Sequence, residues 1–180
     1  MTLKPWKTLS REIKFKNRWW TYIVDKYVLP SGREGEYHFV HTGGSVFIIP
    51  VLGNGKLLLV KQYRYLNERF SLEFPGGGVK DGEDPDEIAH KELIEETGFD
   101  GELEKIGIFN PFCGVTSEYC HVYVARSLKA SDKEKPDDSE EFELHEVSAG
   151  EFEGKISTNE IFSGMSLASW ALAKEKLLKF

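Results

Sequence analysis

Four glutamates in one short segment carry the clearest chemical signal in the sequence. Glu83 follows a run of three glycines, and Glu92 lies three residues before Glu95 and four before Glu96. On a helix these spacings place side chains on overlapping faces, so the last three carboxylates would crowd together. Oxygen donors gathered in this way suit a hard divalent cation, Mg²⁺ or Mn²⁺. A solvated acidic helix face is the competing interpretation, and charge alone would favour it.

The residues around these glutamates predict a glycine loop followed by a helix. Asp84 can cap the first turn, Pro85 suits the first helical position, and Gly98 can end the helix after Thr97. The glycines at 76–78 allow positive φ angles and a close approach of the backbone to a ligand. The predicted helix, 85–97, would then hold the carboxylates beside that loop.

The register of the whole segment resembles the Nudix signature. That signature is Gly, five residues, Glu, seven residues, then Arg-Glu-hydrophobic-x-Glu-Glu-x-Gly-hydrophobic. The matching positions are Gly77, Glu83, Glu92, Leu93, Glu95, Glu96, Gly98 and Phe99. Lys91 replaces the arginine, which keeps the charge but loses the planar fork. The resemblance implies Glu92, Glu95 and Glu96 as metal ligands, the Gly76 carbonyl as a further candidate ligand, and Glu96 as a catalytic candidate.

We call the stretch that matches this signature, residues 77–99, the box. The segments before the box resemble one group of the family, the nucleoside diphosphate sugar hydrolases of ADP-ribose pyrophosphatase type. The similar stretches are 61–64 (Lys-Gln-Tyr-Arg) and 72–77 (Leu-Glu-Phe-Pro-Gly-Gly). In that group the corresponding Arg and Glu contact substrate or metal, so the resemblance implies substrate-binding roles for Arg64 and Glu73. A solvated charge at a strand end and an edge-strand carboxylate are the alternatives.

Candidates after the box come from two loops. The stretch 113–118 resembles the group's Pro-Gly-x-x-x-Glu segment, and Glu118 is the candidate there, as a site residue or as a turn cap. Cys113 replaces the marker proline, so the resemblance implies the diphospho-sugar class rather than ADP-ribose in particular. Related enzymes carry a further carboxylate in the later loop, where Glu140 is the first choice for the base and Glu141 the alternative.

Aromatic residues near the N-terminus are the candidates for contact with a nucleobase. Trp20 and its neighbours Trp19 and Tyr22 are large enough to stack on a flat base. In the resembling group, N-terminal strands often exchange between the subunits of a homodimer and help to form the base pocket. Packing within a hairpin or a dimer interface is the alternative role for these rings.

The remaining pattern predicts an α+β fold. We expect a Nudix-like α/β/α sandwich with a mixed sheet, preceded by an N-terminal β-hairpin of the kind that is swapped in dimers. The expected division is residues 1–43 as this segment and 44–180 as the Nudix hydrolase domain. Predicted strands are 19–29, 37–40, 45–51, 56–62, 71–74, 103–109, 121–125 and 142–147, with an exposed loop at 129–139 and a second long helix over 159–178.

The composition of the chain limits the kinds of partner and the compartment that we expect for it. The chain has 180 residues and a formal charge of −7, with an isoelectric point near 5.3, which argues against a nucleic acid polymer as partner. No run approaches the ~20 apolar residues of a membrane span, and the first residues do not resemble a secretory signal. Two cysteines without a metal-binding spacing suit a reducing compartment. We therefore expect a cytoplasmic protein.

Together these features predict metal-dependent hydrolysis of the diphosphate bond of nucleoside diphosphate sugars, such as ADP-ribose, ADP-glucose or GDP-mannose. The products would be a nucleoside monophosphate and a sugar phosphate. One alternative is a Nudix domain that binds a nucleotide sugar and regulates without cleaving it. Another, within the class, is a nucleoside triphosphate pyrophosphohydrolase.

Overall fold

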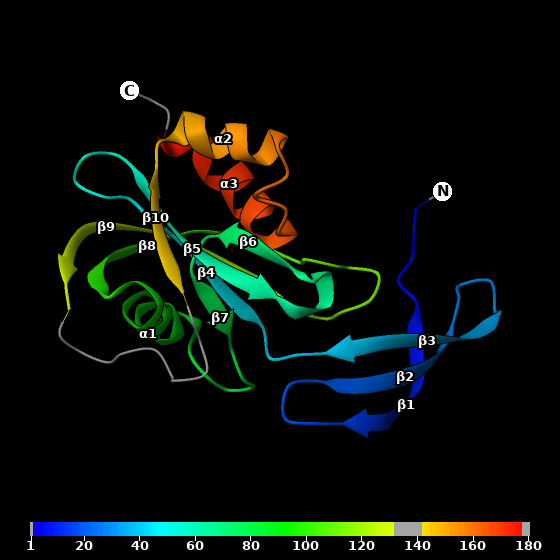
Figure 1. The fold of residues 1–180 in the computed structure, drawn as a ribbon. Coiled ribbons are helices and arrows are strands. Elements are labelled where there is room, and N and C mark those ends of the chain that lie inside the picture. The colour runs from blue at the N-terminus through cyan, green and yellow to red at the C-terminus, as the bar shows by residue number, and fades with distance from the viewer. Residues whose placement is uncertain (1, 132–141, 178–180) are drawn as a thin grey trace.

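The computed structural model describes residues 2–131 and 142–177 (Figure 1). After residue 44 the described residues form two sheets and three α-helices. A mixed sheet has the order β7-β4-β9-β8, in which only β4 and β9 run parallel, and an antiparallel sheet has the order β10-β5-β6. The strands are β4 (Ser45–Pro50), β5 (Leu57–Arg64), β6 (Arg69–Glu73), β7 (Gly76–Gly78), β8 (Phe99–Phe109), β9 (Cys120–Ala130) and β10 (Glu143–Val147), with a 3-10 turn η1 (Tyr65–Asn67).

Alternation along β4 explains the layers. Val46 and Ile48 belong to the apolar cluster under α1 (Pro85–Thr97). Phe47 and Ile49 face the opposite way, toward the second sheet and the helices α2 (Ala149–Ser157) and α3 (Gly164–Leu177). Successive strand residues point to opposite faces, so a fully buried strand needs cover on both. Figure 1 shows α1 on one side of the sheets and α2 with α3 on the other. The predicted α/β/α sandwich with a mixed sheet is confirmed.

Helix α1 has the predicted bounds and the predicted ends. The Asp84 carboxylate accepts a hydrogen bond from the Asp86 backbone N–H at 2.9 Å, and Pro85 occupies the first turn. Gly98 has φ of +71° and its N–H donates to the Ile94 carbonyl at 2.8 Å. A left-handed residue of this kind commonly ends a helix, and glycine adopts it without strain. The glycine loop before it also contains the short strand β7, which was not predicted.

The C-terminal region contains two helices where one was predicted. The long helix begins at Gly164 rather than 159, and α2 was missed. Ser148 and Glu151 form a capping box: the Glu151 N–H donates to Ser148 Oγ at 3.2 Å, and the Ser148 N–H donates to Glu151 Oε2 at 2.7 Å. The Ser-x-x-Glu signal for this helix was therefore present in the sequence. None of the described helices is long and apolar enough to cross a membrane.

The N-terminal segment is a three-stranded antiparallel sheet, not a two-stranded hairpin. Its strands are β1 (Lys7–Lys16), β2 (Thr21–Val28) and β3 (Glu34–His41), in that order. The first was not predicted, although Leu9, Ile13 and Phe15 alternate with polar residues along it; all ten of its residues are exposed. The predicted strand start at Trp19 was also wrong. The Asn17 side chain accepts from the N–H groups of Trp19 and Trp20 at 2.8 and 2.9 Å, which places both tryptophans in the turn before β2.

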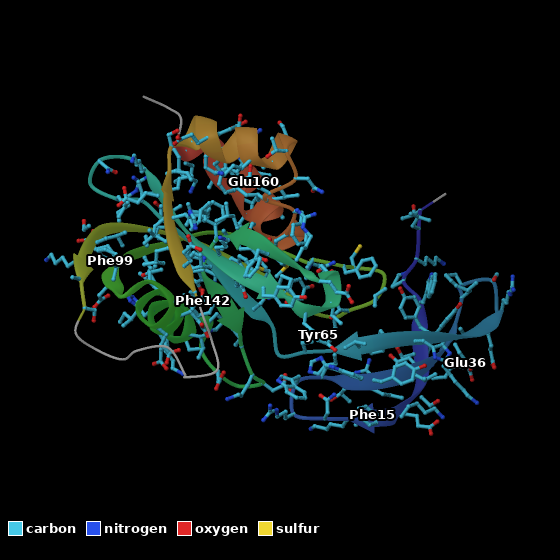
Figure 2. The ribbon with its side chains drawn as sticks, viewed as in Figure 1. Phe15, Glu36, Tyr65, Phe99, Phe142 and Glu160 are labelled. Atoms are coloured by element: carbon cyan, nitrogen blue, oxygen red, sulfur yellow. The ribbon has the colours of Figure 1, made fainter. Side chains whose placement is uncertain are left out.

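This N-terminal sheet extends to one side of the sandwich, away from α2 and α3 (Figure 1). In Figure 2 the labelled side chains of Phe15 and Glu36 project from it into solvent. The sheet joins the sandwich along β3, where the Val40 N–H donates to the Val115 carbonyl at 2.8 Å. The Ser117 N–H donates back to the Val40 carbonyl at 3.1 Å. One edge of the sheet is therefore held against the loop before β9.

Candidate functional site

Arg64, the last residue of β5, and Glu73, the last residue of β6, form a bidentate ion pair. Arg64 Nε donates to Glu73 Oε1 at 2.7 Å and Nη2 donates to Oε2 at 2.5 Å. The Glu73 carboxylate is only 1% exposed, whereas the arginine side chain is 42% exposed. Hydrogen bonding to Glu73 raises the pKa of Arg64, and the charge of Glu96 acts in the same direction.

Two box glutamates lie against the first glycines of the loop. The Gly76 N–H donates to Glu96 Oε2 at 3.0 Å, and Glu96 is largely buried. A Cβ on Gly77 would lie 2.1 Å from Glu92 Oε1, so any larger residue would displace that carboxylate. Glycine is required at 76 for another reason, because its Cβ would lie 2.2 Å from the Val46 carbonyl oxygen. The close approach of β7 to β4 and to α1 therefore requires glycine at both positions.

The other two box glutamates, Glu95 and Glu83, contact residues within the same segment. Glu95 Oε1 lies 3.4 Å from Lys91 Nζ, so the lysine that replaces the signature arginine pairs with a neighbouring glutamate. Glu83 accepts from the Lys80 N–H at 2.8 Å and holds the turn before α1. Among the described residues, no three His, Cys, Asp or Glu side chains are gathered closely enough to form a metal site. The carboxylates of Glu92 and Glu96 and the backbone at Gly76 nevertheless supply the oxygen donors that a hard divalent cation prefers.

The ion pair of Arg64 and Glu73 and the backbone at Gly76 open into a pocket of about 520 Å³. The side chains of Arg64 and Glu73 and the glycines of β7 line one side of it. The other side comes from the segment that leads into α3, including Phe162, Ser163 and Gly164. Sequence reasoning missed that segment, because it is more than 60 residues from the end of the box and follows no recognisable motif.

A second hollow, of about 660 Å³, adjoins this pocket, because Ser45 and Gly78 line both. We call it the cleft. It lies between the β1–β2 turn, which contributes Trp19 and Trp20, and the loops around Asp81 and Glu118. The Ser45 hydroxyl donates to Glu118 Oε1 at 2.6 Å, which orients that carboxylate. The structure thus brings Trp20 and Glu118 to one cleft, and Arg64, Glu73, Glu92 and Glu96 to the region around Gly76.

The two candidates for the catalytic base, Glu140 and Glu141, lie outside the described residues. Their roles stay predictions. The roles assigned to the other candidates also stay predictions: Trp20, Arg64, Glu73, Gly76, Glu118 and the three box glutamates.

Comparison with known proteins agrees with the fold and the site. The model of the NUDIX domain matches residues 41–162. The chain is 32% identical over 162 residues to the ADP-ribose pyrophosphatase of Bacillus subtilis (strain 168), covering 87% of this chain and 85% of that one. It is 34% identical over 137 residues to the methanol dehydrogenase activator of Bacillus methanolicus, covering 76% and 74%. A crystal structure of an ADP compounds hydrolase shares the fold, with a TM-score of 0.85 at 21% identity, covering 99% of this chain and 97% of that chain.

The chain belongs to the Nudix hydrolase family. It is an enzyme of that family, and the relatives to which it is similar include an ADP-ribose pyrophosphatase.

Proposed function

We propose that this enzyme hydrolyses the phosphoanhydride bond of nucleoside diphosphate sugars in a reaction that depends on a divalent metal. The products are a nucleoside monophosphate and a sugar phosphate. The observation that carries the proposal is the convergence of Arg64, Glu73 and Glu96 on the glycines of β7 beside one pocket. The similarity to the Bacillus subtilis ADP-ribose pyrophosphatase over most of both chains supports the substrate class.

The diphosphate would lie in the pocket beside Arg64. Glu73 engages Nε and Nη2 of the guanidinium, which leaves the Nη1 edge to donate to a phosphate oxygen. Because Glu73 also fixes the guanidinium plane, the arginine is already oriented before substrate binds. Its positive charge would stabilise negative charge that develops on the phosphate oxygens during cleavage.

The metal would be held by Glu92, Glu95 and Glu96 with the Gly76 carbonyl, and Mg²⁺ or Mn²⁺ suits these oxygen donors. When bound, such an ion offsets charge on the diphosphate and lowers the pKa of the attacking water. Glu95 would have to leave Lys91 to take part. Glu140 or Glu141 would accept the proton from the water, in line with the sequence prediction.

The nucleoside half would occupy the cleft, with its base against Trp20 and its polar edge toward Glu118. Aromatic rings supply area for stacking on any base, so this contact sets affinity more than it selects a base. The two adjoining hollows together match a ligand with a charged centre and a flat end.

We also propose a homodimer built through the N-terminal segment, residues 1–43. Large apolar side chains are exposed across its sheet and turn: Trp6, Leu9, Ile13, Phe15, Trp19, Trp20 and Tyr37. Contiguous apolar surface of this kind usually marks an association site. Light scattering tests the proposal by measuring the molar mass in solution, and the mass of a monomer at micromolar concentration would contradict it.

The decisive experiment measures hydrolysis of ADP-ribose, ADP-glucose, GDP-mannose, a dinucleoside polyphosphate and an oxidised nucleoside triphosphate. Each reaction is run with and without Mg²⁺, and phosphate released by added phosphatase is followed. We expect metal-dependent cleavage of one or more sugar diphosphates. Turnover of the triphosphate alone would support the pyrophosphohydrolase alternative. Calorimetric binding of a sugar diphosphate without turnover would support the regulatory alternative.

A further inference from the structure

His41 connects three elements that surround the cleft. It is the last residue of β3, so it belongs to the N-terminal sheet. Its Nδ1 lies 2.9 Å from Ser117 Oγ, in the loop that leads to Glu118. Its Nε2 lies 3.1 Å from Asp81 Oδ1, in the loop between β7 and α1. One imidazole ring therefore joins the N-terminal sheet to the loop before β9 and to the Nudix-box loop.

The chemistry of the two partners determines how the ring is used. The Asp81 carboxylate accepts hydrogen bonds, so Nε2 carries the proton and donates. The Nδ1 atom of a neutral ring then accepts from the Ser117 hydroxyl, which can donate. A neutral histidine thus satisfies both contacts with one proton. No other side chain offers a donor and an acceptor at this separation on a rigid ring.

Backbone contacts on both sides of His41 bring the same elements together. On one side, Val40 exchanges hydrogen bonds with Val115 and Ser117. On the other side, the Val79 N–H donates to the Gly44 carbonyl at 2.9 Å. A Cβ on Gly43 would lie only 2.3 Å from the Val79 carbonyl oxygen, which shows how closely this linker packs on the box loop. His41 stands at the point where the two sets of contacts meet.

We propose that His41 is a positioning residue that holds the cleft at the width required by the nucleoside half of the substrate. By linking Ser117 to Asp81, the ring fixes the wall that carries Glu118 relative to the box loop and to Trp20. This inference rests on the proposed function. Because the reacting phosphates would lie in the adjoining pocket, His41 affects binding of the nucleoside and not the chemical step.

The size of the effect follows from two hydrogen bonds at a site that is 39% exposed. Each contributes modestly, because solvent can replace a lost partner at a partly exposed position. We therefore expect His41→Ala to raise KM about 3- to 10-fold while kcat changes by less than about 2-fold.

The test uses three variants and a matched control. His41→Ala removes both contacts, His41→Gln retains an amide N–H for Asp81, and His41→Asn retains an amide oxygen for Ser117. We expect KM to be intermediate in the two amide variants. His38→Gln is the control, since His38 lies on the same strand and its Nδ1 lies 2.7 Å from the Tyr22 hydroxyl, outside the cleft. It should leave both kinetic constants unchanged.

Hydrogen exchange of the backbone amides separates this inference from the proposed function. We expect the amides of Val40, Val79 and Ser117 to exchange faster in His41→Ala than in His38→Gln, whether or not the enzyme turns over a given substrate. If the wild-type protein cleaves no sugar diphosphate, the proposed function fails while the exchange result still tests the link. Unchanged exchange with unchanged KM, or a loss confined to kcat, would overturn the role of His41.

Discussion

The central strand of the sandwich and the first strand of the N-terminal sheet are opposites in burial. All six residues of β4 are buried, whereas all ten residues of β1 are exposed. β4 is covered on one face by α1 and on the other by the second sheet with α2 and α3. β1 has β2 beside it and is open to solvent. The apolar residues of β4 are therefore buried within the sandwich itself, whereas the N-terminal sheet leaves apolar side chains exposed to solvent.

Different forces hold the two regions together. In the sandwich, the ring of Phe152 stacks on Phe74 with a centroid separation of 4.8 Å and packs at a tilt against Trp170 with a separation of 4.9 Å. In the N-terminal sheet, Arg11 donates to both oxygens of Asp25 at 2.8 and 2.7 Å, and Ile23 and Val24 of β2 are buried. We expect the sandwich to dominate the free energy of unfolding, because buried apolar area contributes more than partly exposed ion pairs.

The largest expected difference between the sandwich and the N-terminal sheet is in how much one side chain contributes to the free energy of unfolding. Phe152→Ala should lower the free energy of unfolding by about 3–5 kcal/mol, because it leaves a cavity at a fully buried position. Ile13→Ala, at a residue that is 60% exposed, should cost less than about 0.5 kcal/mol. Urea unfolding of both variants measures the two costs. A larger cost for Ile13→Ala that depends on protein concentration would show that a partner subunit covers β1, and equal costs in dilute protein would contradict the comparison.

The next largest difference between the two regions is expected in the kinetic constants, kcat and KM. Glu96→Gln in α1 should lower kcat at least about 100-fold with the fold retained, because the amide can still accept from the Gly76 N–H but carries no charge. Trp20→Ala in the N-terminal turn should instead raise KM. Steady-state kinetics of both variants checks the division of roles, with exposed Glu87→Gln on the same helix as the control. Full activity in Glu96→Gln would exclude it as a metal ligand.

The N-terminal sheet should also lose stability in acid. Hydrogen bonding to Arg11 lowers the pKa of Asp25 below its usual value of about 3.9. The carboxylate therefore contributes stability above that value, and the contribution is lost as the pH falls through the lower folded pKa. Hydrogen exchange of the β1–β2 amides between pH 5 and pH 3 follows this loss. Arg11→Leu should abolish the pH dependence, and its persistence would assign the effect to another group.

The smallest expected difference concerns the two thiols. Burial in β9 raises the pKa of Cys120 to about 12, whereas Cys113 lies in an exposed loop. Iodoacetamide at pH 8 should therefore modify Cys113 in the native protein and Cys120 only after unfolding. Mass spectrometry of the labelled peptides shows which cysteine reacts. Rapid native labelling of Cys120 would mean that the end of β9 opens readily.

Signals that lie within a few residues of each other were the ones that could be predicted. The bounds of α1 followed from Asp84, Pro85 and Gly98, and the box register followed from glutamate spacing on that helix. The mixed sandwich followed from strand-sized apolar runs and the family resemblance. The second helix, α2, was equally local, and its Ser148 and Glu151 capping box could have been recognised despite two glycines in the helix.

Contacts between distant segments were decided only by the tertiary structure. β1 carries no burial pattern, so its existence depends on pairing with β2, including the Arg11 and Asp25 contact across 14 residues. The link from His41 to Ser117 spans 76 residues and involves side chains that no local motif singles out. The sequence by itself determined the helix that carries the carboxylates, because capping and periodicity act between near neighbours. Only folding decided which loops face that helix, because loop positions depend on packing between segments far apart in the chain.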